Sequence, residues 1–110
     1  MTQHDDTIIL SHMLEHAVEA LQITQGKTRA DVYDDRILNL ALARLLEIIG
    51  EAASRVPQST RDNVSQIPWN AIVAMRNRLT HGYDQVDLDI IWDVIQNDLP
   101  PLVEELRKIL

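Results

Sequence analysis

The stretch that decides the fold is ILNLALARLLEIIGEAASRV, residues 37–56. Its apolar residues recur at the three- and four-residue spacing of an α-helix, at Ile37, Leu38, Ala41, Leu45, Ile48, Ile49 and Ala52. Further apolar side chains at Leu40, Leu42 and Leu46 widen this surface beyond what one neighbouring helix covers. The pattern predicts a long helix, ended by Pro57, that lies at the centre of a bundle or also faces a second subunit.

The segment before this helix predicts another helix. Its apolar residues share the same spacing, at Leu10, Met13, Leu14, Ala17 and Leu21. Asp5 and Asp6 stand near its start, where acidic side chains favour the positive end of the helix dipole. Gly26 lies beyond its end, as expected of a residue that follows a helix.

Two helices are predicted between residues 58 and 82. The first is short and has Ser59 or Thr60 as its N-cap. The second starts with Pro68 in its first turn, where the missing N–H has no cost. It runs to about His81, and Gly82 provides a left-handed C-cap.

The last segment predicts an interrupted helix. Asp87 can cap its start, and apolar residues follow at helical spacing, at Ile90, Ile91, Val94 and Ile95 and again from Leu102 to Leu110. Pro100 and Pro101 stand between the two groups. Because proline removes a hydrogen bond and clashes with the preceding turn, the helix must kink or restart there.

The composition agrees with a helical core in one domain, residues 1–110. Of the 110 residues, 45% are hydrophobic and 4% aromatic, with no phenylalanine, so Leu, Ile, Val and Ala must fill the core. Trp69 and Trp92 are expected in the core or an interface rather than as platforms for bases. No segment has the pattern of a strand or a repeat. We predict an all-α, antiparallel bundle of four or five helices that forms a two-fold dimer.

The charge distribution limits the classes of partner. The net charge is −7, but residues 21–82 carry eight Lys or Arg against six acids. Phosphate is attracted by local potential, so contact with nucleic acid would be confined to a site.

No cysteine is present, which excludes disulfides, thiolate metal sites and a cysteine nucleophile. No basic, apolar leader and no membrane-spanning run is visible, so we expect a cytoplasmic protein without membrane contact.

The segment MRNRLTHGY, residues 75–83, gathers the candidate catalytic groups. Asn77 and His81 are four apart, so on a helix the amide can hydrogen-bond the imidazole and fix its tautomer. Arg76 is five residues before His81 and points about 140° away from it. The 2′-hydroxyl of an RNA can attack the adjacent phosphate and cleave the strand without metal. This reaction needs an acid and base, which histidine can provide, and a cation that stabilises the phosphorane, which arginine can provide. Two copies of this segment across a dimer would bring four such groups together.

Residues 75–83 also allow a purely structural interpretation. A histidine in the last turn of a helix satisfies the dipole, and Arg76 or Arg78 could pair with Asp84 or Asp87.

A metal site on the first helix is the weaker chemical alternative. His12 and His16 are four apart, with Glu15 and Glu19 nearby. A zinc-protease motif needs glutamate directly after the first histidine, and Met13 stands there instead. We therefore expect no metal.

Glu47 and Glu51 could support His81, but a structural role is favoured. They alternate with Arg44 and Arg55 at helical spacing, which predicts ion pairs along one helix face.

Three blocks of sequence resemble the HepT-like branch of the HEPN-domain family: LLEIIGEAA (45–53), IPWNAIVAMRNRLTHGY (67–83) and VDLDIIWDVIQNDLPPLVEEL (86–106). They stand in that family's order and spacing, and the resemblance covers roughly residues 5–110. It implies a HEPN-like bundle and a metal-independent endoribonuclease that needs no cofactor, with its active site between two protomers.

The resemblance also implies roles for individual residues. Arg76 and His81 would be catalytic, with Asn77 and Arg78 in support. HepT-like proteins are toxins that act on RNA and are encoded beside a minimal nucleotidyltransferase antitoxin, which can add AMP to a tyrosine two residues after the histidine. Tyr83 stands at that position. The alternative is a non-catalytic HEPN protein that binds nucleotide or a nucleotidyltransferase partner.

Overall fold

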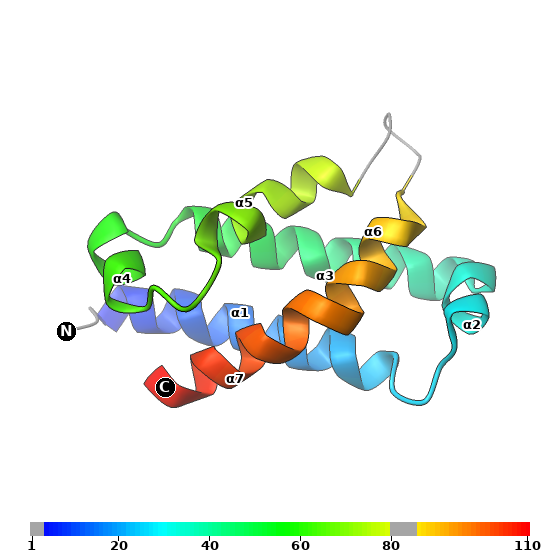
Figure 1. The fold of residues 1–110 in the computed structure, drawn as a ribbon, viewed down its shortest axis with the longest axis horizontal. Coiled ribbons are helices and arrows are strands. Elements are labelled where there is room, and N and C mark those ends of the chain that lie inside the picture. Colours follow the sequence, from blue (N-terminus) through cyan, green and yellow to red (C-terminus); the bar gives the residue numbers. More distant parts are fainter. Residues whose placement is uncertain (1–3, 80–85) are drawn as a thin grey trace.

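The computed structural model describes residues 4–79 and 86–110, and it is all-α (Figure 1). The elements are α1 (His4–Ile23), α2 (Arg29–Asp34), α3 (Arg36–Ser54), α4 (Gln58–Asn63), α5 (Trp69–Arg78), α6 (Leu88–Asp93), a π-helical turn η1 (Val94–Asp98) and α7 (Leu99–Ile109). No β-strand occurs in the described residues. The predicted all-α class is confirmed.

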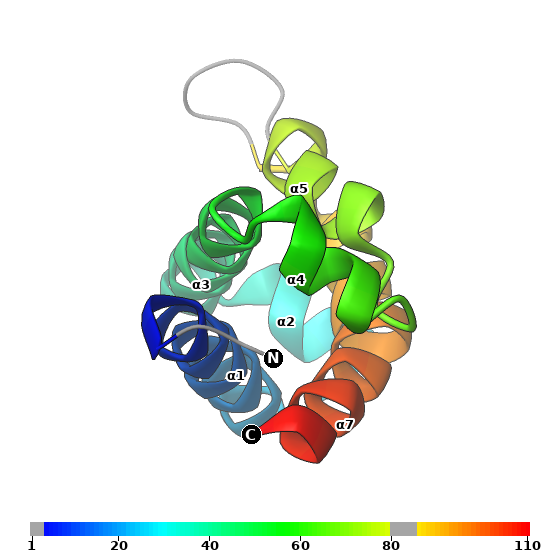
Figure 2. The same ribbon diagram turned by 90° about the vertical axis from the view of Figure 1, so that its left-hand side faces the viewer.

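The helices form an up-and-down bundle around one core. Helix α1 packs against α3 and α7, and α5 packs against the other side of α3. Figure 2 looks along the bundle and shows α1, α3, α5 and α7 around a shared interior. The short helices α2 and α4 lie at opposite ends of the molecule (Figure 1). None of the helices in the described ranges is both long and apolar enough to cross a bilayer.

The long helix predicted from residues 37–56 is α3, which packs against α1, α2, α5 and α6. Helix α3 buries one stripe of side chains in the core, at Leu38, Leu42, Ala43, Leu46, Ile49 and Ala53. Its surface is wider than the bundle covers, because Ile37 is 81% exposed and Leu40 is 49% exposed.

Helix α5 ends at Arg78, earlier than the predicted end near His81. Leu79 is the C-cap, and its carbonyl accepts a hydrogen bond from the backbone N–H of Asp87 at 2.6 Å. This hydrogen bond joins the end of α5 to the residue before α6. His81 and the predicted Gly82 cap lie outside the described residues.

The cap of α6 was predicted, whereas α2 was not. The carboxylate of Asp87 accepts from the N–H of Ile90, as expected for an N-cap. Helix α2 starts with a capping box, in which Thr28 and Asp31 exchange side-chain-to-backbone hydrogen bonds at 3.1 and 3.0 Å. A threonine followed three residues later by an acid was the signal for this helix.

The predicted N-cap of α4 is wrong. The helix begins at Gln58, and neither Ser59 nor Thr60 caps it. Thr60 instead points inward, where its hydroxyl donates to the carboxylate of Asp6 on α1 at 2.6 Å, and both residues are buried.

The two prolines of the last segment restart the helix, as predicted. Pro100 and Pro101 occupy the first turn of α7, where their missing N–H groups have no cost. The preceding turn is a π turn, in which the N–H of Leu99 donates to the carbonyl of Val94.

Candidate active site

The last turn of α5 carries Arg76, Asn77 and Arg78, and all three are exposed. Within residues 4–79 and 86–110, no side chain forms an ion pair with Arg76 or Arg78. The guanidinium groups of Arg76 and Arg78 are thus available to bind an anion, beside the amide of Asn77.

Gly50 on α3 sets how closely α5 approaches. A Cβ atom placed on Gly50 would lie 3.2 Å from the carbonyl oxygen of Ile72 and 3.7 Å from the Cβ of Arg76. Only glycine permits this crossing without a shift of α5. The crossing therefore fixes the backbone position of Arg76.

Helix α5 separates its side chains into two faces. Ile72 and Met75 are buried, and Asn70, Ala74 and Asn77 lie on the opposite, exposed face. The buried face fixes the rotation of α5 and leaves Asn77 directed to solvent.

Arg78 lies within electrostatic reach of the π turn η1. The pKa of Asp98 is raised above its ordinary value, chiefly by burial and then by repulsion from Asp93, and the charge of Arg78 opposes that increase. Asp98, whose ionisation is disfavoured by burial, thus lies near Arg78.

The described residues on either side of residues 80–85 form hydrogen bonds. At one end is the hydrogen bond between the Leu79 carbonyl and the Asp87 N–H. At the other, Asp87 caps α6. His81 and Tyr83 themselves lie outside the described residues.

A second anchor joins the first turn of α6 to α2. The carboxylate of Asp89 accepts hydrogen bonds from Tyr33 and from Arg29, the latter at 2.7 Å. These bonds lower the pKa of Asp89. The pKa of Tyr33 is raised, first by burial and then by its bond to Asp89.

The other charged candidates have structural roles. Arg44 pairs with Glu47 at 3.3 Å and Arg55 with Glu51 at 3.1 Å, so the predicted ion pairs are confirmed.

The two histidines of α1 form no metal cluster. The Nδ1 of His16 lies 2.6 Å from the carbonyl oxygen of His12. The part of the chain that the structure describes contains no group of three or more His, Asp or Glu side chains placed to hold a metal ion.

The tryptophans lie as predicted. Trp69 is 7% exposed, and its indole N–H donates to the carbonyl of Val64 at 3.0 Å. Trp92 is half-buried and packs against the core.

The fold and the motif define a HEPN-like helical domain: a helical bundle that exposes an arginine and an amide shortly before a histidine in the sequence. The chain belongs to the HepT-like ribonuclease family, because the family model described as "Ribonuclease HepT-like" matches residues 13–109.

Curated relatives agree with this family. The chain is 38% identical over 106 residues to the "Gamma-glutamylcyclotransferase and putative RNase MJ0434" of Methanocaldococcus jannaschii, covering 96% of this chain but only 48% of that protein. It is 36% identical to the "Putative RNase TTE0752" of Caldanaerobacter subterraneus subsp. tengcongensis, covering 92% and 90%. It is 34% identical to the "Probable ribonuclease HepT" of Thermococcus cleftensis, covering 86% and 93%. No solved structure matches the chain.

Proposed function

We propose that this protein is a metal-independent endoribonuclease that cleaves RNA with Arg76 and His81, and that it is the toxin of a toxin–antitoxin pair. The observation that carries the proposal is the last turn of α5, where two exposed guanidiniums have no ion-pair partner among the described residues and stand shortly before His81 in the sequence. Membership of the HepT-like ribonuclease family supports the choice of RNA as substrate.

The proposed reaction is an intramolecular transesterification of the RNA, which releases the strand on the 3′ side of the cut. The 2′-oxygen attacks the adjacent phosphorus, the bond to the 5′-oxygen breaks, and a 2′,3′-cyclic phosphate and a 5′-hydroxyl result. His81 takes the proton of the 2′-hydroxyl, and an acid must donate a proton to the leaving oxygen. Arg76 stabilises the charge on the phosphorane. Asn77 orients the imidazole, and Arg78 attracts the phosphate backbone.

A two-fold dimer completes this proposal, because one histidine cannot be base and acid in the same step. A second protomer would supply another His81. The exposed Ile37 and Leu40 on α3 support assembly, since apolar side chains this exposed favour burial against a partner.

The proposal is tested with purified protein and a labelled RNA. We expect Arg76→Ala to lower the cleavage rate about 10²–10³-fold and His81→Ala to lower it about 10²–10⁴-fold. Asn77→Ala should cost less, because its amide orients rather than reacts. Arg107→Ala, which removes an exposed arginine from α7, is the matched control and should behave as wild type. EDTA should not inhibit.

The cleavage assay also decides between the two function classes. A folded His81→Ala protein with full activity would end the catalytic assignment. A wild-type protein that binds nucleotide or a nucleotidyltransferase but leaves RNA intact would establish the non-catalytic alternative.

We further propose that a minimal nucleotidyltransferase antitoxin silences the protein by adding AMP to Tyr83. The added phosphodiester would stand two residues from His81 and could occupy the place of the scissile phosphate beside Arg76 or Arg78. Tyr83→Phe should stay toxic in cells that express the antitoxin, and mass spectrometry of co-expressed wild type should show AMP on Tyr83. Modification confined to other residues would contradict this regulation.

A further inference from the structure

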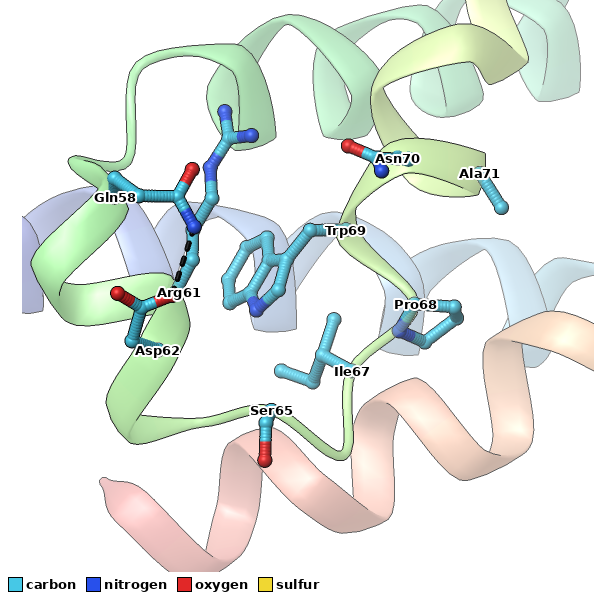
Figure 3. A pocket seen from close by; sticks show the side chains of 9 residues that line it. All are labelled: Gln58, Arg61, Asp62, Ser65, Ile67, Pro68, Trp69, Asn70 and Ala71. Atoms are coloured by element: carbon cyan, nitrogen blue, oxygen red, sulfur yellow. Dashed lines mark hydrogen bonds between the residues drawn. The ribbon is translucent and has the colours of Figure 1, made fainter.

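A cavity of about 400 Å³ lies between α4 and the start of α5 (Figure 3), whereas Arg76 and Arg78 lie in the last turn of that helix. Ile67, Pro68 and Trp69 contribute apolar lining. Polar side chains surround the opening, and Asn70 and Ala71 place one wall on α5. This volume is within the range of roughly 300–1,000 Å³ typical of small-molecule sites.

The walls of this cavity are held by hydrogen bonds to the backbone. Arg61 donates through Nε to the carbonyl of Val56 at 2.9 Å and through Nη2 to that of Ala53 at 3.0 Å. Its guanidinium stands 5.8 Å from the centre of the Trp69 ring. Trp69 in turn donates to Val64. The cavity is therefore formed before any ligand arrives.

The lining selects for an uncharged, planar group. It contains one cation, Arg61, and one anion, Asp62, so it carries no net charge. The carboxylate of Asp62 already accepts from the amide of Gln58 at 2.8 Å (Figure 3). A phosphate would meet this carboxylate, whereas a nucleobase has donors and acceptors on its edge and a face that suits a guanidinium plane.

One exposed face of α5 runs from the cavity to Asn77 and Arg78, whereas Arg76 lies on the other side of the helix, next to Gly50 of α3. Asn70 and Ala71 line the cavity, Ala74 follows, and Asn77 and Arg78 end the same face. The alanines leave this path open. From residue 70 to residue 78 the rise is about 12 Å at 1.5 Å per residue, which about three or four stacked nucleotides span at 3.4 Å each.

We propose that this cavity is a subsite for one nucleobase of the RNA substrate, about three or four nucleotides from the phosphate that Arg78 attracts. This subsite rests on the proposed ribonuclease function. The base edge faces Asn70 and Asp62, and its plane lies against Arg61. A flanking base that must fit here would make cleavage depend on the sequence beside the cut.

The test fills the cavity and measures RNA binding. In a His81→Ala background, which keeps the RNA intact, Ala71→Trp adds a large side chain at an exposed wall position. Ala30→Trp makes the same change on an exposed position of α2, at the other end of the molecule, and is the matched control. For an unstructured RNA of about a dozen nucleotides, we expect Ala71→Trp to weaken binding roughly 5- to 100-fold relative to Ala30→Trp, the range for loss of one stacked base. Equal affinities of the two folded variants would overturn the subsite.

A second measurement needs no change in the cavity. Trp92→Phe leaves Trp69 as the single tryptophan. We expect nucleosides and RNA to change the emission of Trp69, and inorganic phosphate to leave it unchanged. A response to phosphate but not to nucleosides would overturn the assignment to a base. If wild type neither cleaves nor binds RNA, the ribonuclease function itself falls. If it cleaves RNA while RNA leaves Trp69 emission unchanged, only the subsite falls.

Discussion

Replacing Gly50 by alanine tests whether the crossing of α3 and α5 positions the candidate active site. The new methyl group would meet the Ile72 carbonyl oxygen at 3.2 Å and the backbone nitrogen of Arg76 at 3.7 Å. The first contact is tight and involves backbone, so α5 must move away from α3 by a few tenths of an ångström. Arg76 moves with it.

Two opposing effects set the change in stability. Alanine is favoured over glycine inside a helix by about 1 kcal/mol. Overpacking of this kind costs roughly 1–3 kcal/mol. The free energy of unfolding should therefore fall by about 0–2 kcal/mol, and each kcal/mol lowers Tm by about 4 °C in a domain of this size. Displacement of Arg76 should lower the cleavage rate by roughly tenfold, because small misplacements of a catalytic group reduce rate steeply.

Gly26→Ala is the matched control. Gly26 has φ +76°, and nothing lies within 4 Å of the place that a methyl group would take, so alanine there causes backbone strain of about 1–2 kcal/mol without touching α5. Thermal unfolding and initial cleavage rates, corrected for the folded fraction, compare the two variants. We expect both to lose stability and only Gly50→Ala to lose activity. A Gly50→Ala protein as active as Gly26→Ala would refute the positioning role.

Three further predictions concern stability, each measured by urea unfolding. Thr60→Val should cost about 1.5–3 kcal/mol, because it removes the donor to the buried carboxylate of Asp6; Ser59→Ala, an exposed neighbour, is the control, and equal losses would contradict the reasoning. Asp98 has a raised pKa, so the folded state binds its proton more tightly, and the protein loses stability as pH rises from 3.8 through the folded pKa. Asp98→Asn should therefore be more stable than wild type at neutral pH, and this difference should vanish below pH 3.8. Asp89 has a lowered pKa, so its contribution is present above pH 3.8 and is lost as pH falls through the folded pKa; Asp89→Asn should be less stable than wild type at neutral pH, and a constant difference down to strong acid would contradict this assignment.

The long helices could be predicted because their apolar spacing is unambiguous. The stripe of α3 and the cap at Asp87 are both local patterns. The end of α5 depends instead on a bond between Leu79 and Asp87, which no local pattern encodes. The role of Thr60 was missed for the same reason, since Asp6 is far away in the sequence.

The residues of the candidate site can be proposed from the sequence, whereas the surroundings of α5 could not be predicted from it. The spacing within residues 75–83 and the family resemblance point to Arg76 and His81, whose catalytic roles stay predictions. The close approach at Gly50 and the cavity beside Trp69 depend on how distant segments pack. Trp69 is buried, as the sequence predicts, and it also lines that cavity.

The contact between α1 and α7 has a consequence during synthesis on the ribosome. Helix α1 packs against α7 as well as α3, and α7 is made last of these three. Until it emerges, one flank of α1 has no partner, so a nascent chain exposes apolar side chains that proteases and chaperones recognise. The bundle therefore closes only after α7 has followed α1 and α3 out of the ribosome.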